Sequence, residues 1–277
     1  MKPEKTKTHE IAVTFDGSFD GFLCVVYACY YEKIDPVSIQ DESMAQLVLE
    51  TDSRFIETNP NHAARVFSAI REKISEEAAN YVYNAFLSFE DDRYMTMLNY
   101  IKMGFSRGHI IDSNWQNDCV RRIRKLAGHV AGEAHLLLGF CRFEETKQGV
   151  FYCKITPKNS VLPILADHFS QRLMGQAWII HDKTNGEAAI FNGHSYVITA
   201  APRDAVVELA DGEEETQEMW VAFFNALTIK ARINPKLQRQ LLPLHFRGNM
   251  TEFKRTHRVS DVVNSQSKCN SGIYTCV

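Results

Sequence analysis

The sequence predicts an α+β fold, in which an antiparallel sheet of about four to five strands is flanked by several helices. Apolar residues recur at helical spacing through most of the N-terminal half, and short strands separated by Gly and Asn turns dominate the stretch from about residue 139 to residue 200. Of the 277 residues, 45% are hydrophobic and 23% are charged, so the chain can bury a full globular core.

The N-terminal half is expected to be rich in helices. It opens with a strand at residues 10–15, a turn at Asp16-Gly17 and a helix. Further on, Pro60 suits the first turn of a helix, and Ser75 and Asp91 or Asp92 suit the caps of two more. The other elements expected here are a strand at 52–57 and helices at about 60–74, 77–89 and 93–104.

A helix expected from Asn117 to about Ala134 carries the densest basic surface of the sequence. Its apolar side chains recur on one face, and cations occupy the other. Such a face can contact phosphates, or it can be an ordinary solvated helix surface. The basic residues concerned are Arg121, Arg122, Arg124, Lys125 and His129.

Residues 137–156 read as two short strands around a Gly-containing turn. A symmetric hairpin pairs Phe143 with Phe151, Arg142 with Tyr152 and Cys141 with Cys153. One face then carries the apolar core residues, and the other mixes aromatic rings with cations. That second face could stack bases and meet phosphates, or a helix could pack on it while the cationic heads reach water. Its residues are Phe140, Arg142, Tyr152 and Lys154.

The C-terminal half is expected to alternate helices with the strands of the sheet. A helix over 161–175 precedes three strands, and an acidic run leads into a helix with apolar residues on one side. Asn234-Pro235 caps a last helix. We expect one domain over residues 1–253 and a flexible polar tail over 254–277.

The richest polar cluster of the sequence lies on the 161–175 helix and the strand after it. If its members converge, they could form a phosphate or base pocket, with His168, His181 and Asp182 as acid–base groups and Arg172 holding a phosphate. Lone histidines and capping aspartates are also common at such junctions, so a structural role stays open. The cluster comprises His168, Arg172, Trp178, His181, Asp182 and Lys183.

Several classes of function lack their sequence signatures. The chain has no phosphate-binding P-loop, no G-x-S-x-G elbow and no cysteine with an evident base. Its seven cysteines form neither a zinc motif nor a three-cysteine cluster motif, so we expect no metal or cofactor and free thiols. The net charge of −3 excludes a generic polyanion binder. Without an apolar leader or membrane span, the protein is expected to be cytoplasmic.

Four blocks occur in one order over most of residues 11–253: FDGSFDGFLCVVYACY, EAHLLLGFCRFEE, LADHFSQRLMGQAWIIHD and MWVAFFNALTIKARINPKLQRQLLP. Together they resemble the bacterial "probable DNA metabolism protein" family, which is built on a domain of unknown function. The resemblance implies a role in DNA repair or DNA modification. Members are typically encoded beside a radical SAM protein assigned to that chemistry, and a similar domain is fused to uracil-DNA glycosylase-like domains.

The resemblance carries over no catalytic residues, since none is established for the family. Members often have an arginine shortly after the Ile-x-Asp stretch, whereas this chain continues Asp182-Lys183-Thr184. A binding role for that arginine is therefore not expected here.

Three hypotheses of function follow. The first is an accessory protein of DNA metabolism that docks with the radical SAM partner and contacts DNA. The second is an enzyme that acts on damaged bases or nucleotides, and the third is a protein-binding module without nucleic-acid contact. The residues expected to contact nucleic acid or phosphate are Arg142, Tyr152, Lys154, Arg172, Arg121, Arg122, Lys125 and Trp178.

Overall fold

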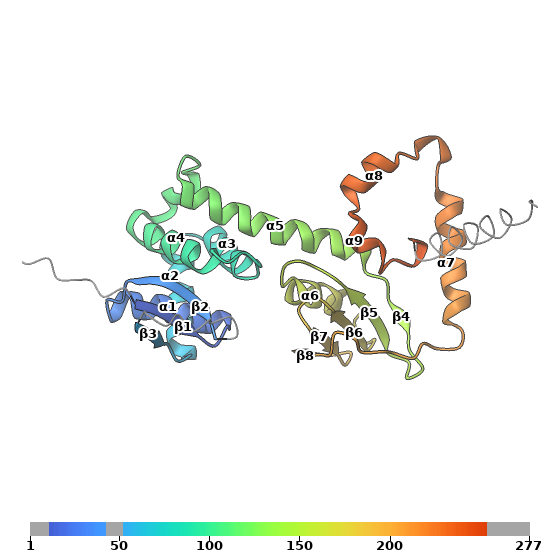
Figure 1. The fold of residues 1–277 in the computed structure, drawn as a ribbon, viewed down its shortest axis with the longest axis horizontal. Coiled ribbons are helices and arrows are strands. Elements are labelled where there is room, and N and C mark those ends of the chain that lie inside the picture. Colours follow the sequence, from blue (N-terminus) through green and yellow to red (C-terminus); the bar gives the residue numbers. More distant parts are fainter. Residues whose placement is uncertain (1–10, 43–51, 254–277) are drawn as a thin grey trace, which may run out of the picture. The chain divides into compact units, whose positions relative to one another are not determined.

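The computed structural model describes residues 11–42 and 52–253 of a chain that divides into two compact units, 1–131 and 132–277 (Figure 1). The single domain over residues 1–253 stays a prediction, and the predicted tail at 254–277 lies outside the described residues. Helix α5 (Asp118–Phe140) begins in the first unit and ends in the second. No helix in the described ranges combines the length and apolar character that crossing a bilayer requires.

The first unit contains a three-stranded parallel sheet with the order β2-β1-β3. β1 (Ile11–Phe15) lies in the middle and pairs with β2 (Pro36–Asp41) and β3 (Asp52–Phe55). Helix α1 (Phe19–Tyr31) supplies the crossover that two parallel neighbours need. The strands β1 and β3 were predicted from the sequence, whereas β2 and the parallel sheet were not.

The start of α1 is fixed by a network at the end of β1. Ser18 is the N-cap, and its hydroxyl accepts a hydrogen bond from Gly21 N at 2.9 Å. The Asp16 carboxylate accepts bonds from Ser18 N and Ser18 Oγ at 2.9 and 2.7 Å, and from Thr58 Oγ1 at 2.7 Å. Gly17 has a φ of +80°, which favours glycine in this turn.

Helices form the rest of the first core, and the sequence predicted this helical content. The caps Asn59 and Ser75 accept hydrogen bonds from the first turns of their helices. Phe15 meets Tyr94 edge to face at 5.1 Å, and Phe22 stacks on Tyr94 at 5.8 Å. The elements are α2 (Pro60–Lys73), α3 (Glu76–Phe86), α4 (Arg93–Arg107) and the 3-10 helix η1 (Gly108–Ser113).

The second unit contains the predicted sheet, but this sheet is mixed and not antiparallel. Its order is β4-β5-β6-β7-β8, and the pair β5–β6 is parallel while the other pairs are antiparallel. The reason is helix α6 (Leu162–Arg172), which lies between β5 and β6 in the chain and carries it back across the sheet. The strands are β4 (Glu144–Glu145), β5 (Phe151–Ile155), β6 (Trp178–Asp182), β7 (Glu187–Phe191) and β8 (Tyr196–Ala200).

The predicted register of the first hairpin is wrong by two residues. Glu144, and not Arg142, pairs with Tyr152. The loop is short because Thr146 N donates to Val150 O at 3.0 Å and Gly149 takes a φ of +73°, the left-handed conformation of a three-residue hairpin loop. The preceding segment extends α5 to Phe140, so Arg142 lies outside any strand.

The cysteines of this hairpin do not pair across strands as predicted, but their side chains still interact. A hydrogen bond with Cys153 raises the pKa of Cys141 well above its usual range, and burial raises it further. Both thiols are free.

The last part of the second unit is helical. α7 (Glu213–Leu227) follows the acidic run as predicted, and α8 (Pro235–Leu241) starts at the predicted cap Asn234. The predicted last helix is interrupted at Pro243, and α9 (Leu244–Arg247) continues after it, because proline cannot donate the backbone hydrogen bond of a helix interior. A 3-10 turn, η2 (Lys230–Arg232), joins α7 to α8.

The packing at Gly21 gives a stability prediction. A β-carbon there would overlap Asp16 Oδ1 and lie 2.9 Å from Thr58 Oγ1, within a network held by several hydrogen bonds. We expect Gly21→Ala to lower the free energy of unfolding by about 1–3 kcal/mol. Chemical denaturation followed by circular dichroism measures this change in the free energy of unfolding.

Gly128→Ala is the matched control. A β-carbon at Gly128 meets nothing within 4 Å, and alanine is the better helix former, so a gain of about 0.5–1 kcal/mol is expected. Equal effects of the two substitutions would contradict the packing argument.

Candidate functional site

The sheet of the second unit brings Tyr152 and His181 together. Tyr152 lies on β5 and His181 on β6, and the tyrosine hydroxyl and His181 Nδ1 are 2.7 Å apart. His181 is only 2% exposed, and Tyr152 is buried as well. The predicted candidates Tyr152 and His181 thus form one buried hydrogen-bonded pair.

The imidazole of His181 is held in an apolar setting. Burial lowers its pKa below 6.5, and Lys183 lowers it further, while the Asp182 charge opposes the change. Nε2 of His181 makes no hydrogen bond within the described residues, and the same holds for Trp178 Nε1. Both nitrogens are buried, so neither is presented to solvent in the described structure.

His181 does not share a pocket with its neighbours on the strand. Successive side chains of a strand point to opposite faces, so Trp178 and Asp182 lie on the face opposite His181. The Asp182 carboxylate accepts hydrogen bonds from Thr184 N at 2.9 Å and from Asn185 N and Nδ2 at 3.0 and 2.6 Å. These bonds close the turn after β6, although burial raises the pKa of Asp182.

The two candidates on α6 stand apart from this pair. His168 is half-buried and lies edge-on to Phe169, with ring centroids 5.1 Å apart, and Arg172 is exposed in the last turn. No hydrogen bond or ion pair of the described structure joins either of them to His181 or Asp182. The hydrogen bonds and ion pairs of the described residues therefore do not join these histidine, arginine and aspartate candidates into one site.

Arg142 is part of a clamp around the buried Glu252 carboxylate, and we define this clamp as Arg142, Trp220 and Glu252. Nε and Nη2 of Arg142 donate to the two carboxylate oxygens of Glu252 at 3.2 and 2.6 Å, and the guanidinium lies 5.2 Å from the Trp220 ring. Nη1 donates to the carbonyls of Gly139 and Cys141 at 2.9 and 3.0 Å. Each nitrogen of the guanidinium is thus already bonded within the protein, and none is directed at a ligand.

The Glu252 carboxylate is the centre of this clamp. Its side chain is 1% exposed, and it also accepts a hydrogen bond from Trp220 Nε1 at 3.1 Å. Burial alone would raise the pKa of Glu252, but the bonds from Arg142 and Trp220 outweigh it and hold the pKa below its usual value. The carboxylate is therefore ionised and paired at neutral pH.

The basic face of α5 is also largely engaged with the protein itself. Arg122 forms ion pairs with Glu90 and Asp92 at 2.7 and 2.6 Å, and these bonds raise the pKa of Arg122 and lower that of Asp92. Arg121 pairs with Asp118 one turn away. Lys125 and His129 remain exposed.

Two further predicted cationic contacts have protein partners. Arg124 lies over the Trp115 ring at 3.7 Å and over the Tyr81 ring at 4.8 Å. Lys154 Nζ is 3.8 Å from a carboxylate oxygen of Glu144, the residue that replaces Arg142 in the hairpin register. In the described conformation, the basic groups predicted for phosphate contact are mostly paired.

The first unit holds a site that the sequence did not predict, a hollow of about 630 Å³ between α1, α2 and α4. We call it the aromatic hollow. Its aromatic walls come from α1 and α4, and its charged groups from α2. It is lined by Tyr27, Tyr30, Tyr31, Arg65, Val66, Ser68, Ala69, Glu72, Lys73 and Phe105.

Stacked rings form one wall of the aromatic hollow. His62 stacks on Tyr27 at 3.9 Å with an angle of 6° between the rings, and Tyr27 stacks on Tyr31 at 4.3 Å. The Arg65 guanidinium lies 5.0 Å from the centroid of the Tyr31 ring. Tyr31 is 56% exposed, so a further planar group can approach it.

The other wall pairs an aromatic edge with a cation. Tyr30 meets Phe105 edge to face at 5.4 Å, and Lys73 Nζ lies 6.0 Å from the Phe105 ring. The sequence did carry a signal for this site. Tyr27, Tyr30 and Tyr31 are spaced so that one face of α1 presents three rings, a face that the apolar pattern alone assigns to packing.

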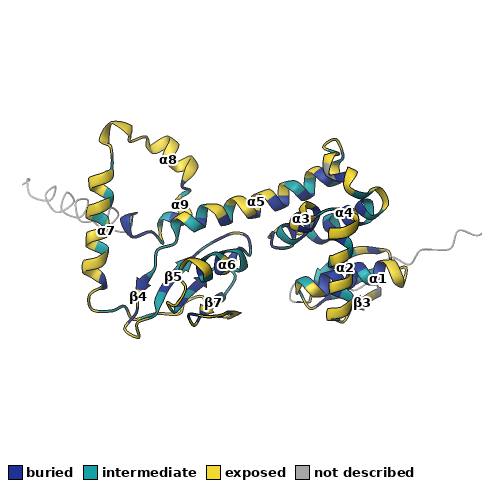
Figure 2. Cartoon of the chain, turned by 180° about the vertical axis from the view of Figure 1, so that it is seen from behind, coloured by how far each residue is buried: buried dark blue, intermediate teal, exposed yellow. Residues whose placement is uncertain are grey.

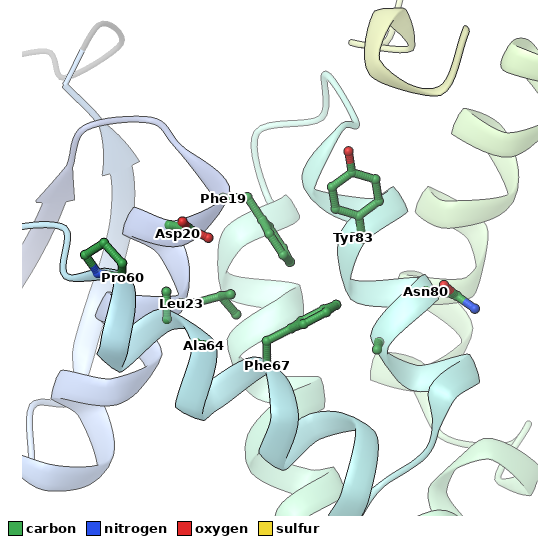
Figure 3. Close-up of a pocket in the computed structure, with 10 residues that line it drawn as sticks. Phe19, Asp20, Leu23, Pro60, Ala64, Phe67, Asn80 and Tyr83 are labelled. Carbon is green, nitrogen blue, oxygen red and sulfur yellow. The ribbon is translucent and has the colours of Figure 1, made fainter. Parts of the chain in front are cut away.

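A second hollow in the first unit, of about 420 Å³, is mainly apolar (Figure 3). Phe19, Phe67 and Tyr83 point toward one another from three helices, with Phe19 5.8 Å from Phe67 and 5.2 Å from Tyr83. A carboxylate, Asp20, and a carboxamide, Asn80, also line this second hollow. No cation lines it, which makes it a poorer site for a nucleic acid than the aromatic hollow.

No cluster of three or more His, Cys, Asp or Glu in the described ranges is arranged to hold a metal ion.

A model of the DUF4130 family, described as a domain of unknown function, matches residues 91–252. The match covers more than half of the chain and ends at Glu252. It includes the clamp and the mixed sheet, but of the aromatic hollow only Phe105. No curated protein matches the chain.

The clamp gives a prediction on stability. Arg142→Ala leaves the buried Glu252 carboxylate without its cation, and we expect a loss of about 3–5 kcal/mol in the free energy of unfolding, measured by chemical denaturation. Arg142→Ala combined with Glu252→Gln is expected to lose less, because no unpaired charge is buried. The exposed pair of Arg121 is the control, and Arg121→Ala is expected to lose less than about 1 kcal/mol. Similar losses in both single variants would contradict the role of the clamp.

The buried His181 gives a prediction on pH. Because its native pKa is lowered from 6.5, the unfolded chain binds the proton more readily than the folded protein. This contribution to stability is fully present above pH 6.5 and is lost as the pH falls through the lower native pKa. His181→Gln should remove that part of the acid sensitivity in unfolding measured across pH, whereas His168→Gln should leave it in place. An unchanged pH profile in His181→Gln would exclude His181 as its source.

Proposed function

The chain belongs to the DUF4130 family, and we propose that it is an accessory protein of DNA repair or modification that binds single-stranded DNA and acts with a radical SAM partner. The observation that carries the DNA-binding part is the aromatic hollow, where a stack of three rings ends in an exposed Tyr31 and a guanidinium. Proteins that bind single strands combine such rings with cations.

The chemistry of the aromatic hollow fits a base with its phosphate. Every base has a flat face that can stack on Tyr31, and Arg65 and Lys73 can meet the backbone charge. Glu72 lines the same hollow, and its carboxylate can accept a hydrogen bond from the amino group of a base. A hollow of about 630 Å³ is within the size range of small-molecule sites, so it has room for an unstacked nucleotide.

The preference for single strands follows from access to the base. In a duplex the faces of the bases are covered by their neighbours, and a protein must pay unstacking free energy of a few kcal/mol to expose one. A stacking wall is therefore best used on DNA that is already unpaired, for example at a lesion under repair.

The setting in DNA metabolism and the radical SAM partner rest on the family resemblance of the four sequence blocks. The sequence has no three-cysteine motif for a radical-generating cluster, so in this proposal the partner supplies the radical chemistry. In the same proposal, the present protein holds the single DNA strand on which the partner acts.

The direct test is a fluorescence anisotropy titration of the full chain with single-stranded, double-stranded and uracil-containing oligonucleotides, repeated over a series of salt concentrations. We expect the tightest binding to single strands and an affinity that falls as salt rises, because phosphate contacts release counterions. Absence of binding to every oligonucleotide at low salt would overturn the DNA-binding proposal.

The aromatic hollow gives a prediction by substitution. Tyr31→Ala should weaken single-strand binding by about 1–3 kcal/mol, which is the range for loss of one stacked base. Phe89→Ala is the matched control, since Phe89 is an aromatic residue of similar exposure that does not line the hollow. Equal affinities of Tyr31→Ala and the wild type would remove the aromatic hollow as the binding site.

A further inference from the structure

Residues 213–242 form an arm of α7, η2 and α8, which contacts the rest of the second unit along α7, where Phe224 lies 6.2 Å from Phe253, and at its end. At the start, the buried Glu213 accepts a hydrogen bond from Glu145 N at 2.9 Å, and Trp220 belongs to the clamp. At the end, Leu242 is buried, and after it Phe246 packs 5.7 Å from Phe140.

Between these anchors the arm exposes a row of large apolar side chains. Figure 2 shows α7 and α8 coloured mainly as exposed. Each member of the row is between 50% and 65% exposed in the described structure. Large contiguous apolar patches mark interaction surfaces on water-soluble proteins. The row comprises Phe223, Leu227, Ile229, Ile233, Leu237 and Leu241.

The arm cannot owe its helices to local propensity alone. α8 has seven residues and α7 has 15, and helices of this length are marginal in water unless an apolar face packs against something. The structure also leaves a hollow of about 440 Å³ between α7 and α8, lined by Phe224, Leu227, Leu237 and Leu241 among others. The arm therefore needs an occupant for its apolar face.

The charges of the arm indicate which occupant fits. α7 carries four glutamates and no basic residue, whereas residues 228–242 carry four basic residues and no acidic one. When two identical arms lie antiparallel, the acidic helix of each meets the basic segment of the other, and both contacts are attractive. Such a surface is self-complementary, as a two-fold interface requires.

We propose that the arms of two copies of this chain pair antiparallel and form a homodimer. The apolar row of each copy then fills the hollow of the other, and Glu214, Glu215 and Glu218 of each α7 face the basic segment of the second copy, which carries Lys230, Arg232, Lys236 and Arg239. The proposal stands apart from DNA binding, since the arm shares no residue with the aromatic hollow.

The first experiment measures the mass of the full chain by analytical ultracentrifugation over a wide range of concentrations. We expect the wild type to form a dimer. Its dissociation constant should rise at least about tenfold in Phe223→Asp and in Leu237→Asp, because each substitution places a charge where an apolar side chain is buried in the dimer interface. Val206→Asp is the matched control, since Val206 is 93% exposed and lies outside the arm. A wild-type monomer at every concentration, or a dimer that neither arm variant weakens, would overturn the proposal.

An exchange of charge tests the antiparallel pairing itself. One variant carries Glu215→Lys and Glu218→Lys, which removes the net negative charge of α7. The other carries Lys236→Glu and Arg239→Glu, which removes the positive charge of its second segment. Each variant alone should dimerise more weakly than the wild type, and their mixture should form a heterodimer with restored affinity. If mixing restores nothing, the arms do not pair in this way.

Discussion

The buried ion pair between Arg142 and Glu252 is the interaction on which the second unit depends. It joins the end of α5 to the last residue of the family match, and through Trp220 it also holds α7. A carboxylate that is 1% exposed is stable as a charge only while the guanidinium stays bonded to both of its oxygens. In the chain, the strands of the mixed sheet lie between α5 and the C-terminal helices α7 to α9. The ion pair of Arg142 with Glu252 joins the residues that follow α5 to the residues that follow α9.

This ion pair explains why Arg142, which the sequence predicts to contact nucleic acid, is bonded within the protein instead. Arg142 has its donors committed to Glu252 and to two backbone carbonyls. The same holds in part for α5, where Arg122 bridges two carboxylates. Among the groups that can still meet a polyanion, Arg65 and Lys73 lie beside aromatic rings in the aromatic hollow of the first unit.

The two proposed surfaces, the aromatic hollow and the arm, differ in the kind of partner that they suit. The aromatic hollow is a concave site with stacking rings and cations, suited to a strand of nucleic acid. The arm is an apolar surface with segregated charge, suited to a protein helix of matching pattern. A dimer through the arm would give a single assembly two hollows, and two binding sites in one assembly raise the effective affinity for a strand that can reach both.

The sequence by itself determined most of the elements of this protein. The caps Ser75 and Asn59, the period of the apolar residues and the Gly and Asn turns fixed β1, α2, α3, α6 and the strands β6 to β8, because these signals are local. The tertiary structure decided what depends on distant residues. β2 forms because β1 provides a parallel strand with which it can pair. β5 and β6 are parallel because α6 carries the chain back across the sheet between them. The register of the β4–β5 hairpin follows from the left-handed conformation of Gly149 and not from a symmetric loop. Which side chains meet was decided in the same way. Arg142 and Glu252 are 110 residues apart, and Tyr27 and His62 lie on different helices, so no spacing in the sequence could have paired them.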